Sequence, residues 1–169
     1  MKYPKVSIIT PSYNQAEFLP HTIESVVSQN YPDLEYIIID GGSTDSSLRI
    51  IKKYAVEFPN IIWISEKDKG QSNAINKGFK MASGEITAWL NSDDTYMPGA
   101  VRMQADFLTE NHNVDLVYGD GAFIDEYGRF KEKFSFAEEF SLEKLINNKI
   151  MIMQPAAFWR KNLFDKIGY

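Results

Sequence analysis

Two hydrophobic patterns alternate along this chain: short runs of β-branched residues, and longer stretches whose apolar residues have helical spacing. The short runs predict buried strands at residues 6–10, 35–40, 61–64, 85–90 and 114–118. The helical spacing predicts helices at residues 17–29, from Ser43 or Thr44 to about 58, 71–82 and 98–111. Strands that alternate with helices in this way predict an α/β fold, with a mostly parallel central sheet and helices on both faces.

The last third of the chain has a different pattern. Residues 121–136 predict two strands joined at Asp125–Glu126–Tyr127–Gly128, which is a small β-hairpin. A short helix near 141–147, a strand at 155–159 and a helical turn near 164–167 are expected to follow. With 169 residues, of which 44% are hydrophobic, the whole chain (1–169) is expected to form one domain.

Polar residues follow the predicted strands at the points where those strands end. Right-handed crossovers place the C-terminal ends of parallel strands on one side of a sheet, here called the carboxyl edge, and ligands bind there. The segments expected at this edge are Pro11–Ser12–Tyr13, Asp40–Gly41–Gly42, Asp68–Lys69–Gly70 and Asp93–Asp94. The sequence therefore predicts a ligand site at the carboxyl edge.

The adjacent carboxylates Asp93 and Asp94 have two explanations. Taken alone, the pair is most simply a turn that caps the next helix. Asp40, however, ends another strand at the same edge, and three gathered carboxylates raise one another's pKa unless a cation balances them. Oxygen ligands favour Mg²⁺ or Mn²⁺, which complete their coordination with phosphate oxygens and water. We therefore predict a divalent metal site that also binds phosphate.

Other residues of the carboxyl edge have side chains that suit a nucleotide. Asp40 could accept hydrogen bonds from a base or a ribose, and Tyr13 could stack on a base. Lys69 is the expected partner of a phosphate, although it could also be a solvated charge. Gly41 and Gly42 predict a turn before a helix capped by Ser43 or Thr44. They form neither a dinucleotide fingerprint nor a P-loop.

Composition excludes several classes of function. A net charge of −5 argues against binding along a nucleic acid backbone, which needs a basic surface. Cysteine is absent, which excludes disulfides, thiolate metal sites and a cysteine nucleophile. No stretch approaches twenty apolar residues, so a soluble cytoplasmic protein is expected.

Two long segments resemble the family 2 glycosyltransferases, in particular bacterial members that build surface polysaccharides. They are VSIITPSYNQAEFLPHTIESVVSQNYPDLEYIIIDGGSTDSS and SEKDKGQSNAINKGFKMASGEITAWLNSDDTYMPGA. The resemblance extends over essentially the whole chain. It implies a GT-A fold and inverting transfer of a sugar from a nucleotide sugar, most simply a UDP-sugar, with Mn²⁺ or Mg²⁺. The acceptor would be a saccharide or a lipid-linked saccharide, with peripheral association of the full-length protein at the inner membrane face.

The resemblance also implies roles for individual residues. Pro11 and Tyr13 would line the nucleobase pocket, and Asp40 would hydrogen-bond the base. Asp93 would contact the ribose or sugar, and Asp94 would bind the metal that bridges the diphosphate. Ser12, Lys69 and Gly70 are expected to complete the donor site.

The resemblance leaves the catalytic base unassigned. In the family this carboxylate usually follows a segment like Gln154–Phe158 and Ile167–Tyr169, so the matching motif would begin after residue 169. The nearby acids Asp115, Asp120, Asp125 and Asp165 do not occupy the matching place, although Asp120, after the fifth predicted strand, could still face the site. We therefore expect a domain that is incomplete at its C-terminal acceptor side.

Two other functions are compatible with acids at the carboxyl edge. A non-catalytic nucleotide-sugar-binding module would need the same donor site but no base. A phospho-receiver-like regulator would need its acid pair after the first strand, where this chain has Thr10–Pro11–Ser12. The first alternative stays open, and the second is disfavoured.

Overall fold

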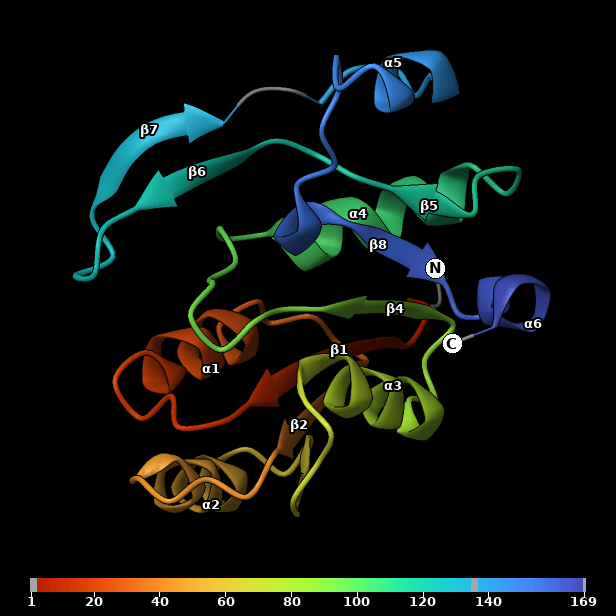
Figure 1. Cartoon of the computed structure of the whole chain (residues 1–169). Coiled ribbons are helices and arrows are strands. Elements are labelled where there is room, and N and C mark those ends of the chain that lie inside the picture. The colour runs from red at the N-terminus through yellow and green to blue at the C-terminus, as the bar shows by residue number, and fades with distance from the viewer. Residues whose placement is uncertain (1–2, 135–136, 169) are drawn as a thin grey trace.

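The computed structural model describes residues 3–134 and 137–168 (Figure 1). Its central sheet has six strands in the order β3-β2-β1-β4-β8-β5, and β6 and β7 form a separate hairpin. The strands are β1 (Val6–Ser12), β2 (Leu34–Asp40), β3 (Ile61–Ser65), β4 (Ile86–Trp89), β5 (Leu116–Val117), β6 (Gly121–Ile124), β7 (Phe130–Phe134) and β8 (Phe158–Arg160). The helices are α1 (Leu19–Val27), α2 (Ser47–Glu57), α3 (Gln71–Met81), α4 (Ala100–Glu110), α5 (Leu142–Ile146) and α6 (Leu163–Ile167).

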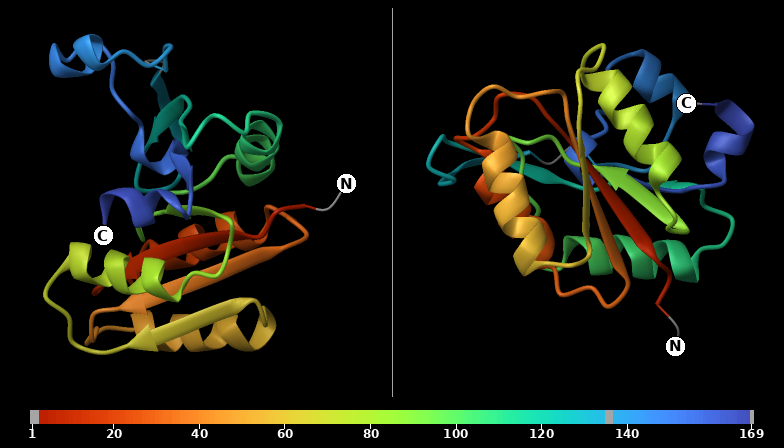
Figure 2. Two further views of the ribbon diagram at one scale, coloured as in Figure 1. Left: turned by 90° about the vertical axis from the view of Figure 1, so that its right-hand side faces the viewer. Right: turned by 90° about the horizontal axis from the view of Figure 1, so that it is seen from below.

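Helices cover both faces of the sheet, as the sequence predicts (Figure 2). Helices α1, α2 and α4 pack on one face, around Ile8, Tyr36 and Phe158. Helix α3 packs on the other face against Ile9 and Ile37, and α6 adds its apolar side there. Both faces of β1 and β2 are therefore buried, which explains why their sequences are continuous apolar runs. The predicted α/β class and hairpin are confirmed.

Strand β8 differs most from the predicted pattern. It runs antiparallel between β4 and β5, pairing Thr87 with Trp159 and Leu116 with Trp159. The predicted strand at 155–159 begins later, because Gln154–Ala156 forms a 3₁₀ turn. Pro155 has no N–H to donate to a sheet, which favours the turn.

The predicted capping of α2 by Ser43 or Thr44 is wrong. The helix begins at Ser47, and the Ser43 hydroxyl instead donates to Asp40 Oδ1 over 2.5 Å. The backbone N–H of Thr44 donates to Asn14 Oδ1 over 2.8 Å. These residues therefore join the loops after β1 and β2 rather than starting a helix. The helix predicted from Pro98 likewise begins later, at Ala100, because Gly99 has a positive φ of 81°.

Helix α3 lies very close to β1 at Gly78. A Cβ atom at this position would overlap the side chain of Ile9, whose Cγ1 would be 2.9 Å away. The absence of a side chain at Gly78 thus allows the helix axis to approach the sheet. The N-terminal end of α3 lies at the carboxyl edge because the helix follows the end of β3 through a short loop.

A buried ionic cluster lies at the opposite edge of the sheet. The Glu35 carboxylate accepts hydrogen bonds from the hydroxyls of Ser7 (2.5 Å) and Ser83 (2.6 Å), and from the Ser83 backbone N–H (2.8 Å). Lys5 Nζ lies 2.9 Å from the same carboxylate. Burial by itself raises the pKa of Glu35, but these donors outweigh it and lower the pKa to about 2.

Glu35 should make stability depend on acidity below pH 5. Its folded pKa of about 2 lies below the ordinary value of 4.5, so its contribution is complete above pH 4.5 and is lost as the pH falls to about 2. We expect the free energy of unfolding to fall by about 2 kcal/mol more in the wild type than in Glu35→Gln over this range. Urea denaturation from pH 5 to pH 2 measures this difference. The same dependence of the free energy of unfolding on pH in the wild type and in Glu35→Gln would contradict this prediction.

Candidate nucleotide-binding site

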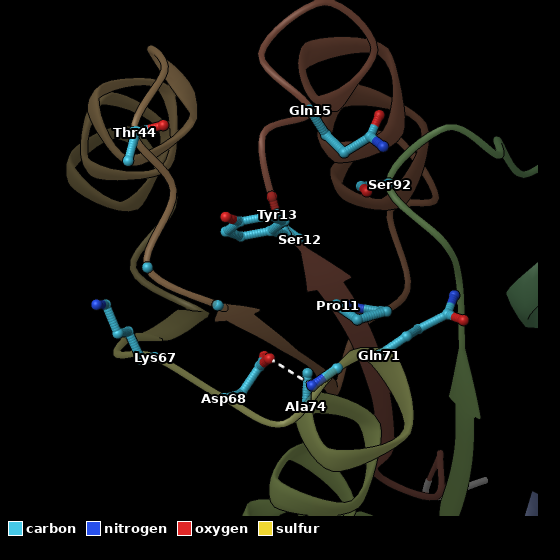
Figure 3. Close-up of a pocket in the computed structure, with 13 residues that line it drawn as sticks. Pro11, Ser12, Tyr13, Gln15, Thr44, Lys67, Asp68, Gln71, Ala74 and Ser92 are labelled. Atoms are coloured by element: carbon cyan, nitrogen blue, oxygen red, sulfur yellow. Dashed lines mark hydrogen bonds between the residues drawn. The ribbon is translucent and has the colours of Figure 1, made fainter.

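A cavity of about 680 Å³ opens at the carboxyl edge, and we call it the edge cavity (Figure 3). The loops that follow β1, β2 and β3 and the first turns of α3 form most of its wall. Its lining residues are Pro11, Ser12, Tyr13, Gln15, Gly41, Gly42, Thr44, Lys67, Asp68, Gly70, Gln71, Ala74 and Ser92. The predicted position of a ligand site is therefore occupied by a cavity.

Glycines allow the β2 and β3 loops to approach each other on one side of the edge cavity. A Cβ atom on Gly41 would lie 2.8 Å from Asp68 Oδ2. Gly42 has a φ of 82°, a conformation that other residues rarely adopt. The Gly70 N–H donates to Asp68 Oδ1 over 2.8 Å, which holds this carboxylate at the start of α3.

The loops after β1 and β2 are tied together on the other side. The Asn14 N–H donates to Ser43 Oγ (2.8 Å), the Gln15 N–H to Ser47 Oγ (2.9 Å) and the Ala16 N–H to Asp45 Oδ2 (3.0 Å). These bonds fix two loops that are distant in the sequence. Hydrogen bonds therefore hold this side of the cavity wall together.

Four of the predicted donor-site residues line the edge cavity: Pro11, Ser12, Tyr13 and Gly70. The Tyr13 side chain is 59% exposed, which leaves its ring accessible for stacking. The Ser12 residue is only 4% exposed, and within the described part of the chain its hydroxyl has no hydrogen-bond partner. A buried polar atom without a partner costs free energy, so this hydroxyl suits a polar ligand.

Asp40 lies behind the cavity wall and is fully buried. Its Oδ2 accepts hydrogen bonds from the N–H groups of Gly42 (3.2 Å) and Ser43 (3.0 Å) and from the Ser65 hydroxyl (2.7 Å). These contacts shape the turn that follows β2. A hydrogen bond from Asp40 to a base stays a prediction.

The lysine on the cavity wall is Lys67, whereas Lys69 is absent from the lining residues. The Lys69 backbone N–H donates to Asn73 Oδ1 over 3.4 Å. Asp68, expected at the carboxyl edge, also lines the edge cavity, and so does Gln71, for which no role is predicted from the sequence. Their positions, after β3 and at the start of α3, are the feature of the sequence that could have indicated a place at the edge cavity.

Asp93 lies on the far side of its loop, in a second groove of about 510 Å³. This groove also contacts α1 and the tip of the β6–β7 hairpin, including His21 and Tyr127. Ser92 lines the edge cavity, so the loop of Ser92 and Asp93 separates the two spaces. The predicted contact of Asp93 with a ribose or sugar stays a prediction.

Asp94 is partly buried and held by its surroundings. Its Oδ2 accepts a hydrogen bond from Asn91 Nδ2 over 3.0 Å, and its backbone carbonyl accepts one from the Thr22 hydroxyl over 2.9 Å. Burial raises the pKa of Asp94, the Asn91 hydrogen bond opposes that effect, and the neighbouring charge of Asp93 adds to it. A cation at this carboxylate would relieve the cost of burying its charge.

The predicted gathering of Asp40 with Asp93 and Asp94 is wrong. Residues 3–134 and 137–168 contain no group of three His, Cys, Asp or Glu side chains placed to hold a metal ion. Asp40 accepts donors from its own turn instead. Asp94, with Asp93 beside it, still offers oxygen ligands. That donor set fits Mg²⁺ or Mn²⁺ only where diphosphate and water complete the coordination.

Three of the acids near the predicted site of the catalytic base form ion pairs with lysine or arginine. Asp120 lies 3.3 Å from Lys133 Nζ in the hairpin, and Asp125 accepts from Arg129 Nε over 2.7 Å. Asp115 lies 2.9 Å from Lys166 Nζ. None of these acids lines the edge cavity.

Comparison with known proteins shows the family of this chain. Residues 7–168 match the family described as Glycosyl transferase family 2. The chain belongs to this family. Among the described residues, no helix is long and apolar enough to cross a membrane.

Relatives in the family act in different syntheses. The chain is 33% identical, over 99% of its length, to a PGL/p-HBAD biosynthesis glycosyltransferase of Mycobacterium tuberculosis, and covers 64% of that protein. It is 33% identical to the chondroitin synthase of Escherichia coli over 88% of its length, covering 22% of that protein. The chain thus spans less than two thirds of the length of these relatives.

Solved structures confirm the GT-A fold. The S. aureus TarS fragment 1-349 in complex with UDP has a TM-score of 0.75 and 24% identity, covering 96% of this chain and 48% of that one. A mannosyltransferase from Pyrobaculum calidifontis, in complex with GDP-Man and Mn²⁺, has a TM-score of 0.75 and 18% identity. It covers 99% of this chain and 47% of that one.

Proposed function

We propose that this chain is the donor-binding part of an inverting, metal-dependent glycosyltransferase that uses a nucleotide sugar, most simply a UDP-sugar. The observation that carries the proposal is the edge cavity of a family 2 chain, with the exposed ring of Tyr13, the buried Ser12 hydroxyl and the cationic Lys67. The ring offers a face to a base, the hydroxyl offers a polar contact and the ammonium offers a charge to a phosphate.

The chemistry of the transfer explains why a cation and a lysine suit this site. When the bond between sugar and diphosphate breaks, negative charge develops on a phosphate oxygen of the leaving group. Lys67 can stabilise this charge from the cavity wall, and Asp94 can hold a divalent ion. The bound ion would supply Lewis-acid stabilisation of the leaving diphosphate.

The acceptor side completes the proposal. An acceptor hydroxyl, on a saccharide or a lipid-linked saccharide, attacks the anomeric carbon opposite the leaving group and inverts its configuration. A carboxylate must take the proton of that hydroxyl. We place this base in the part of the longer protein that would follow residue 169, so the isolated chain should bind the donor better than it transfers the sugar.

Calorimetric titration with UDP, with and without Mn²⁺, tests the donor site. We expect UDP to bind more tightly with Mn²⁺, and Tyr13→Ala to weaken binding roughly tenfold because base stacking on an aromatic ring contributes about 1–3 kcal/mol. Phe107→Ala removes a ring of α4 that is 44% exposed and lies outside both the edge cavity and the groove that contains Asp93, and it should bind UDP normally. Equal affinities of the two variants would contradict the assignment of Tyr13.

Transfer assays separate an enzyme from a non-catalytic module. A longer protein that includes the downstream sequence should transfer the sugar in the presence of Mn²⁺. Binding of UDP without hydrolysis or transfer in that protein would favour the module.

A further inference from the structure

Three polar side chains from distant parts of the sequence meet the Asp94 carboxylate in one hydrogen-bond network, here called the Asn91 network. Gln71 Nε2 donates to Asn91 Oδ1 over 2.8 Å. Asn91 Nδ2 donates to Asp94 Oδ2 over 3.0 Å and to Gln154 Oε1 over 3.1 Å. Gln154 Nε2 donates to the backbone carbonyl of Trp89 over 2.7 Å. Asn91 is the centre of the network, directly after β4.

The two ends of the network determine how each amide is oriented. The Asp94 carboxylate and the Trp89 carbonyl can only accept hydrogen bonds. Asn91 must therefore present its NH₂ group to Asp94, which leaves its oxygen for Gln71. Gln154 must likewise present its NH₂ group to Trp89, which leaves its oxygen for Asn91. Flipping the Asn91 amide would place two acceptors against each other at Asp94.

The network joins three elements that surround the predicted metal ligand. Gln71 is the first residue of α3 and lies on the wall of the edge cavity (Figure 3). Gln154 begins the 3₁₀ turn that leads into β8. Asn91 thus links the Asp94 carboxylate to the wall of the edge cavity through Gln71 and to the segment before β8 through Gln154.

We propose that Asn91 is a positioning residue, which fixes the Asp94 carboxylate so that a divalent ion bound there meets the diphosphate in the edge cavity. The inference rests on the proposed function. Of the two Asp94 carboxylate oxygens, Oδ2 accepts the bond from Asn91 Nδ2, whereas Oδ1 accepts no hydrogen bond within the described part of the chain. Orienting partners of this kind usually change metal affinity by about 10–100-fold when they are removed.

The effect of Asn91 should be confined to metal-dependent binding. We expect Asn91→Ala to reduce the gain in UDP affinity that Mn²⁺ provides by about tenfold or more, because the Asp94 carboxylate loses its only side-chain donor in the network. UDP affinity without metal should stay within about threefold of the wild type. The matched control is Asn60→Ala. Asn60 lies just before β3, and the change removes one hydrogen bond from its side chain to the Leu34 carbonyl.

Calorimetric titrations with UDP, with and without Mn²⁺, measure both quantities, and circular dichroism checks folding. Gln154→Ala leaves the bond between Asn91 and Asp94 in place, so it should reduce the Mn²⁺ gain less, by about threefold. This variant tests the network if Asn91→Ala does not fold: a Mn²⁺ gain equal to the wild type in Gln154→Ala would then overturn the inference.

Two results would overturn the role of Asn91. One is an unchanged Mn²⁺ gain in folded Asn91→Ala. The other is an equal loss of affinity with and without Mn²⁺, which a purely structural role would produce. Absence of UDP binding by the wild type would contradict the proposed function itself, and the inference with it.

Discussion

Replacing Asp94 with alanine should remove the metal-dependent part of UDP binding and leave the fold intact. Asp94 offers a partly buried carboxylate at the carboxyl edge, and its side chain contributes no apolar contact to either core cluster. Loss of a direct metal ligand should exceed the effect of an orienting partner, so we expect a decrease of about 100-fold or more in the Mn²⁺-dependent affinity. Transfer by the longer protein should decrease at least as much, because the leaving diphosphate loses its cation.

A second aspartate provides the control for this experiment. Asp33 is exposed and precedes β2, at the edge of the sheet opposite the edge cavity. Asp33→Ala changes the net charge by the same amount and should keep the affinity for UDP and Mn²⁺. If Asp94→Ala bound UDP with an unchanged metal requirement, Asp94 would not be a metal ligand.

Replacing Gly78 with valine should destabilise the protein by about 3 kcal/mol, because overpacking a tight contact forces the backbone to move. Helix propensity alone predicts the opposite, since glycine disfavours a helix interior by about 1 kcal/mol relative to alanine. At Gly78 the added side chain would overlap Ile9 on β1, and both residues are in close-packed surroundings. Chemical denaturation with urea measures the change.

The alanine variants distinguish packing from propensity. Gly78→Ala should still destabilise the protein, by about 1–2 kcal/mol. Ser72→Ala, at an exposed position of the same helix, should change the free energy of unfolding by less than about 0.5 kcal/mol. If Gly78→Ala stabilised the protein, α3 could move away from β1 without loss of free energy of unfolding, and the packing argument would be wrong.

The sequence predicts the repeating part of the fold well because its signal is local. The run Val6–Thr10 reflects burial on both faces of the sheet, and the apolar spacing of α3 reflects burial of one side of the helix; each pattern is visible within about ten residues. The position of β8 in the sheet has no such local signal in the sequence. Its pairing with β4 and β5 depends on contacts across the last third of the chain, and Pro155 gives only a weak indication of where the strand begins.

The candidate site was predicted by topology and only partly by residue. Parallel strands bring their C-terminal ends together, so Pro11, Ser12, Tyr13 and Gly70 were placed at the edge cavity from the strand pattern. Which of two neighbouring lysines faces the cavity depends on the conformation of the loop. Lys69 was expected to face it, but the lysine that lines the edge cavity is Lys67.

Polar partners were the hardest feature to predict. Ser43 looked like a helix cap because serine is common there, yet its hydroxyl donates to Asp40. Asn91 has no predicted role in the sequence analysis, because its partners Gln71 and Gln154 lie 20 and 63 positions away in the sequence. A hydrogen bond between distant residues leaves no periodic signal.

The antiparallel place of β8 has a consequence for synthesis on the ribosome. Strand β4 leaves the exit tunnel before β8, which is its partner on one side. That side of β4 therefore has no native neighbour until Arg160 has also left the tunnel. An unpaired strand edge invites pairing with other chains. The growing polypeptide therefore exposes this edge of β4 while the segment between Trp89 and Phe158 is synthesised, and the same returning segment brings Gln154 to Asn91.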